Sequence, residues 1–251
     1  MSCVNVRGCP IGEGRPKTIL PIVEGTEAAI LEKAAQFSTL PADCVEWRAD
    51  WFQECRSPAA VARCLQKLRV ALGSKLLLVT FRTQAEGGQV ALSPAEYRQF
   101  LELVLDTDCA DLLDIEFFTA GADLPLLVEQ AHTAGVPVVC SSHDFAKTPP
   151  RPELVERMVQ MQRAGADLPK LAVMPQSCTD VLELLAATAE MADQHPETPV
   201  ITMSMGVLGA VSRLAGETFG SAMTFANPGQ ASAPGQVPLE VVNQVLDALH
   251  L

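Results

Sequence analysis

The sequence predicts a single (β/α)₈ barrel, in which parallel strands alternate with helices. Its 251 residues match the usual size of such a barrel. Short runs rich in Val, Ile and Leu recur at intervals of roughly 20 to 40 residues, with amphipathic segments between them, as in repeated strand–helix units. No Pro/Gly/Ser-rich linker divides the chain, so one catalytic domain over 1–251 is expected, with 1–17 as an extension of unknown role.

Eight apolar runs are expected to form the strands, and eight is the number that closes this barrel. They lie at 17–23, 44–50, 75–83, 112–118, 136–144, 168–175, 199–206 and 221–226. Helices are expected between them, for example at 26–38, 94–105, 123–134, 152–164 and 178–194. Thr26 and Glu27 suit a helix start, and Gly135 and Gly165 suit helix ends.

An open, doubly wound parallel sheet is the main alternative fold. Its dinucleotide-binding form places a G-x-G-x-x-G sequence after the first strand, whereas this chain has EGTEAA there and no P-loop elsewhere. The strand count therefore favours the closed barrel.

Charge and composition narrow the range of partners. The net charge of -12 and the pI near 4.7 argue against a nucleic-acid or anionic-membrane surface, and favour a small-molecule ligand. No apolar run reaches the length of a membrane helix, and the first residues lack the apolar core of a signal peptide, so a cytoplasmic protein is expected. Eight scattered cysteines without a Cys-x-x-Cys pair indicate reduced, mostly buried thiols.

Polar residues gather where the predicted strands end, which is where barrel enzymes place their active sites. These residues are Glu46, Arg48, Arg82, Glu86, Asp114, Glu116, His143, Asp144 and Lys170. Lys170 interrupts an otherwise apolar strand. A buried lysine pairs with a carboxylate or acts as a nucleophile, because burial and nearby cations favour the neutral amine that attacks a ketone to form an iminium.

His143 and Glu86 have both a functional and an ordinary interpretation. His143 ends a strand and would reach a ligand over the barrel mouth, although a lone histidine is more often structural. Glu86 follows a strand beside two glycines, where it could orient the imidazole or simply be a solvated loop residue.

Arg48, Arg82 and Arg213 suggest an anionic substrate, because a guanidinium binds a carboxylate with two hydrogen bonds. The alternative is that they pair with Glu46, Asp114 and Glu116 inside the barrel. These cations and the absence of H-x-H or H-x-x-x-H patterns argue against a metal site.

Six spaced motifs together resemble type I 3-dehydroquinate dehydratase of the shikimate pathway. They are EWRAD-WF, TFRT-x-x-EGG, SSHDF-x-KTP, K-x-AVMP, MSMG-x-x-G-x-x-SR and ASAPGQ, within a match from about Thr18 to the C-terminus. The resemblance implies a cofactor-free syn elimination of water from 3-dehydroquinate, through an imine with the active-site lysine. Lys170 matches that lysine, His143 the proton-transfer residue and Glu86 its orienting partner.

The resemblance also implies substrate contacts and an assembly state. Its substrate-binding residues are Glu46, Arg48, Arg82, Arg213, Ser232 and Gln236. Arg213 matches the partner of the substrate carboxylate, whereas Ser232 and Gln236 belong to a closing lid. Pro21 stands where some family members have a serine near the substrate, and family analogy implies a homodimer.

Two other functions fit the same fold. A class I aldolase or transaldolase shares the barrel and the lysine imine but usually binds phosphate after the seventh and eighth strands. A catalytically inactive barrel kept for binding would also look alike. The presence together of Lys170, His143 and Glu86 argues against the inactive barrel.

Overall fold

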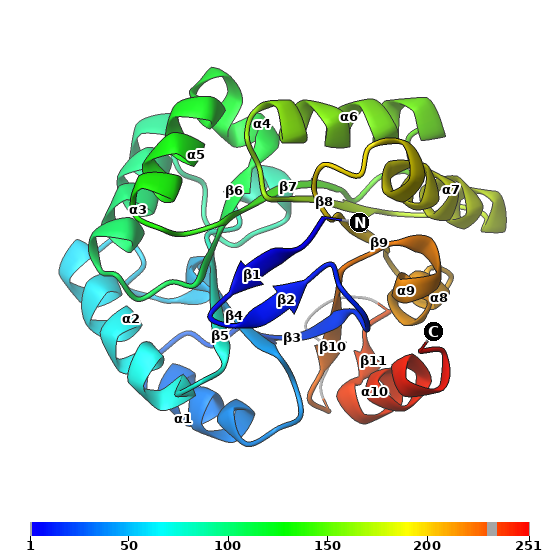
Figure 1. Cartoon of the computed structure of the whole chain (residues 1–251). Helices are drawn as coiled ribbons and strands as arrows, with labels where there is room; N and C mark the ends of the chain where they lie inside the picture. Colours follow the sequence, from blue (N-terminus) through cyan, green and yellow to red (C-terminus); the bar gives the residue numbers. More distant parts are fainter. Residues whose placement is uncertain (1, 230–234, 251) are drawn as a thin grey trace.

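The computed structural model describes residues 2–229 and 235–250, and each predicted strand run overlaps one observed barrel strand (Figure 1). The barrel strands are β3 (Lys17–Ile22), β4 (Cys44–Arg48), β5 (Leu76–Thr80), β6 (Leu112–Glu116), β7 (Val138–Asp144), β8 (Leu168–Val173), β9 (Ile201–Ser204) and β10 (Met223–Asn227). All are parallel to their neighbours, in chain order from β3 to β9.

The sheet closes on itself. Strand β10 pairs with β3, and a parallel bridge between Val200 and Ser221 joins the segments that lead into β9 and β10. The Ala222 N–H donates to the Val200 carbonyl across this seam at 2.8 Å. A short strand, β11 (Val237–Pro238), extends the sheet beside β10. The prediction of a (β/α)₈ barrel is therefore confirmed, and the open-sheet alternative is wrong.

Helices surround the strands (Figure 1). They are α1 (Glu27–Ser38), α2 (Pro58–Leu72), α3 (Pro94–Asp106), α4 (Phe117–Ala120), α5 (Leu124–Thr133), α6 (Arg151–Arg163), α7 (Cys178–Gln194), α8 (Ala210–Leu214), α9 (Gly216–Phe219) and α10 (Leu239–Ala248). Short 3₁₀ turns lie at Ala49–Trp51, Gln84–Glu86 and Gly121–Asp123. The five predicted helices all exist, with ends within two residues of those expected.

The helix ends follow from local chemistry. The Thr26 hydroxyl accepts a hydrogen bond from the Ala29 N–H, so Thr26 is the cap predicted for α1. Ser93 and Glu96 form a reciprocal capping box before α3. Gly135 and Gly165 follow α5 and α6 with φ of 75° and 94°, a backbone region that glycine enters without steric cost.

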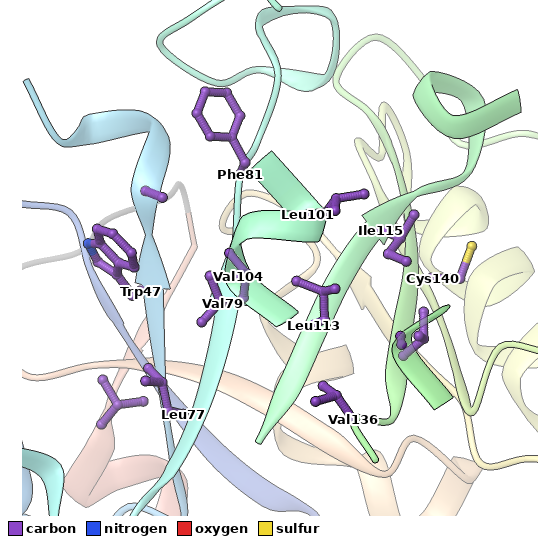
Figure 2. Packing of buried hydrophobic residues seen from close by; sticks show 14 of the residues in the cluster. Trp47, Leu77, Val79, Phe81, Leu101, Val104, Leu113, Ile115, Val136 and Cys140 are labelled. Atoms are coloured by element: carbon purple, nitrogen blue, oxygen red, sulfur yellow. The ribbon is translucent and has the colours of Figure 1, made fainter. Parts of the chain in front are cut away.

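Alternation along each strand divides the core into two layers. Outward side chains pack against the helices, as Figure 2 shows for Val79 and Ile115 near Leu101 and Val104 of α3. Inward side chains form a second apolar cluster, which fills the N-terminal half of the barrel and extends to Met203, Met205 and Phe225 towards its C-terminal end. The inward polar side chains gather at this C-terminal end.

The N-terminal segment forms a hairpin of β1 (Val4–Val6) and β2 (Cys9–Ile11), turning at Arg7 and Gly8 with positive φ at both. Figure 1 shows this hairpin lying across one end of the barrel. Its Val6 and Ile11 side chains join the inward apolar cluster. The hairpin therefore covers the N-terminal end of the barrel, opposite the polar end.

Ile11→Ala is expected to lower the free energy of unfolding by about 2 to 4 kcal/mol, because Ile11 is fully buried and its removal leaves a cavity. Chemical denaturation of the variant measures this loss. Val70→Ala is the control, since Val70 on α2 is 82% exposed and should change the same quantity by less than about 0.5 kcal/mol. An equal effect at both positions would contradict the role assigned to the hairpin.

Among the described helices, none is long and apolar enough to cross a membrane. All eight cysteines are free, as predicted, but only half of them are buried. The buried ones are Cys44, Cys64, Cys109 and Cys140.

Candidate active site

A cavity opens at the C-terminal end of the barrel strands. The predicted site residues that line it are Glu46, Arg48, Arg82, Glu86, His143, Lys170, Arg213 and Gln236. Ser232 lies outside the described residues. Pro21 also lines the cavity, so the proline on the first barrel strand faces the site.

Strand register explains why these residues meet. Lys170 on β8 pairs with Ser141 on β7, and two residues further along the same strands Ala172 pairs with His143. Because side chains alternate along a strand, all four point into the barrel, with His143 one layer closer to the mouth than Lys170. The site is thus a polar layer above the apolar interior.

Lys170 lies at the base of the cavity and is 2% exposed. Its Nζ atom is 3.2 Å from Asp114 Oδ2 and 3.9 Å from Glu46 Oε1, and it lies 4.7 Å from the centre of the Phe225 ring. The lysine is therefore paired with barrel carboxylates, as the ordinary interpretation expects. It also lines the cavity, as the nucleophile interpretation requires.

His143 and Glu86 form a directly bonded pair. Glu86 Oε2 lies 2.8 Å from His143 Nδ1, within hydrogen-bond distance, and accepts from the His143 backbone N–H at 3.0 Å. Burial, together with the charges of Arg82, Lys170 and Arg48, keeps the pKa of His143 well below 6.5. The imidazole is therefore neutral near pH 7, and because Nδ1 is bonded to Glu86, Nε2 is the ring atom left to exchange a proton with a ligand.

Glu86 is buried, at 5% exposed, so the interpretation as a solvated loop residue is wrong. Burial and the neighbouring carboxylates of Glu116 and Asp114 raise the pKa of Glu86 to about 8, against the opposing effect of Arg82. Its second oxygen, Oε1, is buried and has no hydrogen-bond partner among the described residues.

Two glycines bring the Glu86 loop into place. A Cβ atom on Gly88 would lie 1.8 Å from the Arg82 carbonyl oxygen, so only glycine permits this close approach. Gly87 has φ of 84°, and a Cβ there would meet the Phe145 ring at 2.5 Å. The EGG sequence thus lets the loop fold back towards His143.

Arg82 is 3% exposed and is paired inside the barrel. Its guanidinium donates to Glu116 Oε1 and Asp114 Oδ2, each at 2.9 Å, and to the Ser141 hydroxyl at 2.8 Å. Arg82 is therefore an ion-pair partner of carboxylates inside the barrel, as the alternative interpretation of the arginines expects. Arg82 nevertheless lines the cavity and adds positive charge there.

Arg48 and Arg213 differ in their pairing. Arg48 donates two hydrogen bonds to Asp50, at 2.7 and 2.8 Å. Arg213 is 2% exposed, contacts Met203 Sδ at 3.6 Å, and has no ion-pair partner in the part of the chain that the structure describes. Burial lowers the pKa of Arg213 to about 10, which still leaves it cationic near pH 7. Arg213 is therefore the described cation best suited to an incoming anion.

The apolar wall of the cavity was missed by sequence reasoning. It consists of Phe145, Ala172, Met203, Met205 and Phe225. The Phe145 ring lies nearly parallel to His143, with 6.3 Å between ring centres. Strand alternation places Met203 and Met205 on the inner face, so this signal was present in the sequence. Among described residues, no group of three His, Cys, Asp or Glu side chains is arranged to hold a metal ion.

Comparisons with known proteins agree with this geometry. The family model described as "Type I 3-dehydroquinase" matches residues 18–251. The 3-dehydroquinate dehydratase of Bacillus licheniformis is 47% identical over 247 residues, covering 98% of this chain and 97% of the relative.

Two solved structures are also similar. Type I 3-dehydroquinate dehydratase from Clostridium difficile, solved with covalently modified comenic acid, has a TM-score of 0.96 and 42% identity, over 99% of this chain and 98% of that one. The 3-dehydroquinate dehydratase from Enterococcus faecalis has a TM-score of 0.93 and 41% identity, over 99% and 100% of the two chains. Since both the family model and the relatives extend over nearly the whole sequence, this chain belongs to the type I 3-dehydroquinase family.

Proposed function

We propose that this protein converts 3-dehydroquinate to 3-dehydroshikimate and water, through an imine on Lys170. One observation carries the proposal: a buried lysine amine, a neutral imidazole and an unpaired guanidinium line the same cavity. They match the three features of the substrate that react or bind, which are its ketone, its acidic C–H with a leaving hydroxyl, and its carboxylate. The structure of the relative from C. difficile contains covalently modified comenic acid, which supports covalent chemistry in this family.

The first stage forms the imine. The neutral Lys170 amine attacks the ketone carbon, so a C–N bond forms while the carbonyl π electrons move to oxygen. Proton transfers convert this adduct to a carbinolamine and release its oxygen as water, leaving a cationic C=N bond. The positive charge makes the adjacent C–H acidic, because the electrons left by its proton delocalise into the C=N group.

The second stage removes the hydroxyl. Loss of the adjacent proton and departure of the hydroxyl, protonated to water, create a C=C bond conjugated with the imine. Hydrolysis then consumes one water and restores the ketone and the free amine, so the net reaction releases one water. Because the elimination is syn, one group on one face of the ring is able to accept the proton and return it to the leaving hydroxyl.

His143 is proposed as that group. In the proposed tautomer Nδ1 carries the hydrogen and donates it to Glu86, which fixes the orientation of the ring and leaves Nε2 to accept a proton. In its ionised form, Glu86 also stabilises the imidazolium that forms when Nε2 is protonated. The same imidazole serves carbinolamine formation and imine hydrolysis.

Arg213→Gln is expected to lower kcat/KM by about 100-fold, mainly through a higher KM, because the substrate carboxylate loses a buried, charged donor. Steady-state kinetics with 3-dehydroquinate measure the change. Arg56→Gln is the control: Arg56 pairs with Glu96 on the surface, and its loss should leave both constants within about twofold. An unchanged KM in Arg213→Gln would contradict the proposal that Arg213 binds the substrate carboxylate.

Turnover of 3-dehydroquinate tests the proposed function. The expected result is rising ultraviolet absorbance from the conjugated enone product. Inhibition by simple sugar phosphates without such turnover would favour the aldolase alternative, and no activity in either test would favour an inactive barrel.

The closing lid and the assembly rest on the family resemblance. We propose that Ser232 and Gln236 lie on a segment that closes over bound substrate and excludes water while the imine exists. Of these two, Gln236 lines the cavity. We also propose that the protein is a homodimer and that it is located in the cytoplasm. Light scattering coupled to size-exclusion chromatography measures the oligomeric state.

A further inference from the structure

Asp114 is a fully buried carboxylate on β6 that the mechanism above does not use. Each of its oxygens is held by a specific donor. Oδ1 accepts from the Ser141 hydroxyl at 2.7 Å, and Oδ2 accepts from Arg82 at 2.9 Å. Oδ2 also lies 3.2 Å from Lys170 Nζ, the atom that becomes the imine nitrogen. Asp114 therefore contacts a reacting atom without being open to the cavity.

The proposed reaction needs a negative charge beside Lys170 Nζ. Forming the imine fixes a positive charge on the Lys170 nitrogen, which is 2% exposed. An uncompensated charge in such a buried position is strongly unfavourable. Resting on the proposed function, we propose that Asp114 is the counter-ion of the imine: it positions Lys170 Nζ and stabilises the cationic C=N bond throughout the reaction.

The surroundings keep Asp114 ionised. Burial alone would raise the pKa of this carboxyl, but the charges of Arg82 and Lys170 and the hydrogen bond from Ser141 outweigh burial and hold the pKa below 3.8. Because Arg82 remains paired with Asp114 when Lys170 loses its proton, the carboxylate stays charged and in place during attack on the ketone.

Asp114 is a better counter-ion than Glu46, the other carboxylate near Lys170. The distance from Nζ to Asp114 is 3.2 Å, against 3.9 Å to Glu46 Oε1, which also accepts from the Thr80 hydroxyl. The side chain of Asp114 is short, and donors hold both of its oxygens. Glu46 lines the cavity and so is available to the substrate.

The charge at Asp114 has a consequence for the amount of imine formed. The charged and titratable groups around Lys170 are Asp114 on β6, Glu46 on β4, His143 on β7 and Arg82 just beyond β5. The negative charge of Asp114, 3.2 Å from Lys170 Nζ, stabilises the cationic imine in this buried position. Removing that charge should therefore reduce the amount of imine formed.

Asp114→Asn tests this inference against Glu116→Gln. Both changes remove one buried carboxylate bound to Arg82, but only the first removes the carboxylate that lies 3.2 Å from Lys170 Nζ. Each variant is mixed with 3-dehydroquinate and sodium borohydride, and the rate at which the reduced adduct forms on Lys170 is measured by mass spectrometry. Asp114→Asn should trap the adduct on the order of 100-fold more slowly than the wild-type protein. Glu116→Gln should trap it at close to the wild-type rate.

The outcomes separate the two claims. If the wild-type protein gives no adduct on Lys170, the proposed function fails. If the wild-type protein gives the adduct and Asp114→Asn traps it at the wild-type rate, the counter-ion role is overturned. Should Asp114→Asn not fold, Ser141→Ala tests the same carboxylate, because it loosens Asp114 without removing the charge. It should slow trapping about tenfold, and an unchanged rate would count against the inference.

Discussion

Lys170→Ala is expected to lower kcat for 3-dehydroquinate by at least about 10⁴-fold, the largest loss of any single substitution in this protein. Without the amine no imine forms, and the unactivated ketone leaves the adjacent C–H far less acidic. Alanine also removes a cation from beside Asp114 and Glu46, so the thermal unfolding midpoint of the variant must be measured beside its rate. The rate itself is followed by the ultraviolet absorbance of the product.

Lys67→Ala is the matched control for this loss. Lys67 lies on α2, where it forms a surface pair with Glu27, and it does not line the cavity. Its kcat should stay within about twofold of wild type. A folded Lys170→Ala variant with kcat within tenfold of wild type would rule out catalysis through an imine on this residue.

His143→Ala is expected to lower kcat by about 10² to 10⁴-fold, the usual contribution of a positioned acid or base. Imine chemistry would persist slowly, with water carrying the protons. His132→Ala is the control, because His132 pairs with Asp167 at the surface and should leave kcat unchanged. Equal rates in the two variants would exclude His143 from proton transfer.

The protonation state of His143 adds a check that does not depend on turnover. The pKa of His143 lies well below 6.5 because of burial and the nearby cations, so the neutral form is lost only when the pH falls through that lowered value. NMR titration of the imidazole nitrogens in the free protein should therefore show no protonation of His143 between pH 8 and pH 6.5. Titration of His143 near 6.5 would contradict the electrostatic account of the site.

Most of the fold could be predicted because the alternation of strands and helices in the barrel appears in the sequence as apolar runs separated by amphipathic segments. The apolar runs are long enough to identify β3 to β10, and Thr26, Gly135 and Gly165 mark helix ends by local chemistry. The N-terminal hairpin could not be predicted in this way. Its strands have three residues each, which is too short for the alternating pattern of a strand to be recognised. In addition, β2 contains Pro10, a residue that argues against a strand in the sequence. Its position depends on burial of Val6 and Ile11 against residues distant in the chain.

The residues of the active site could be predicted from the sequence, but the hydrogen bonds and ion pairs between them could not. Strand ends and motifs identify Lys170 and His143, since barrel strands bring such positions together. Whether Arg82 binds substrate or a barrel carboxylate depends on distances that no sequence spacing fixes, and the structure pairs it with Asp114 and Glu116. The burial of Glu86 depends likewise on a loop that folds back through Gly88.

The most direct test of the imine mechanism is borohydride reduction of the wild-type protein during turnover of 3-dehydroquinate, followed by mass spectrometry of its peptides. The account predicts loss of activity and a stable adduct on Lys170, with no such adduct when substrate or borohydride is omitted. Continued product formation with no adduct on Lys170 would leave the dehydration reaction in place and contradict the imine mechanism.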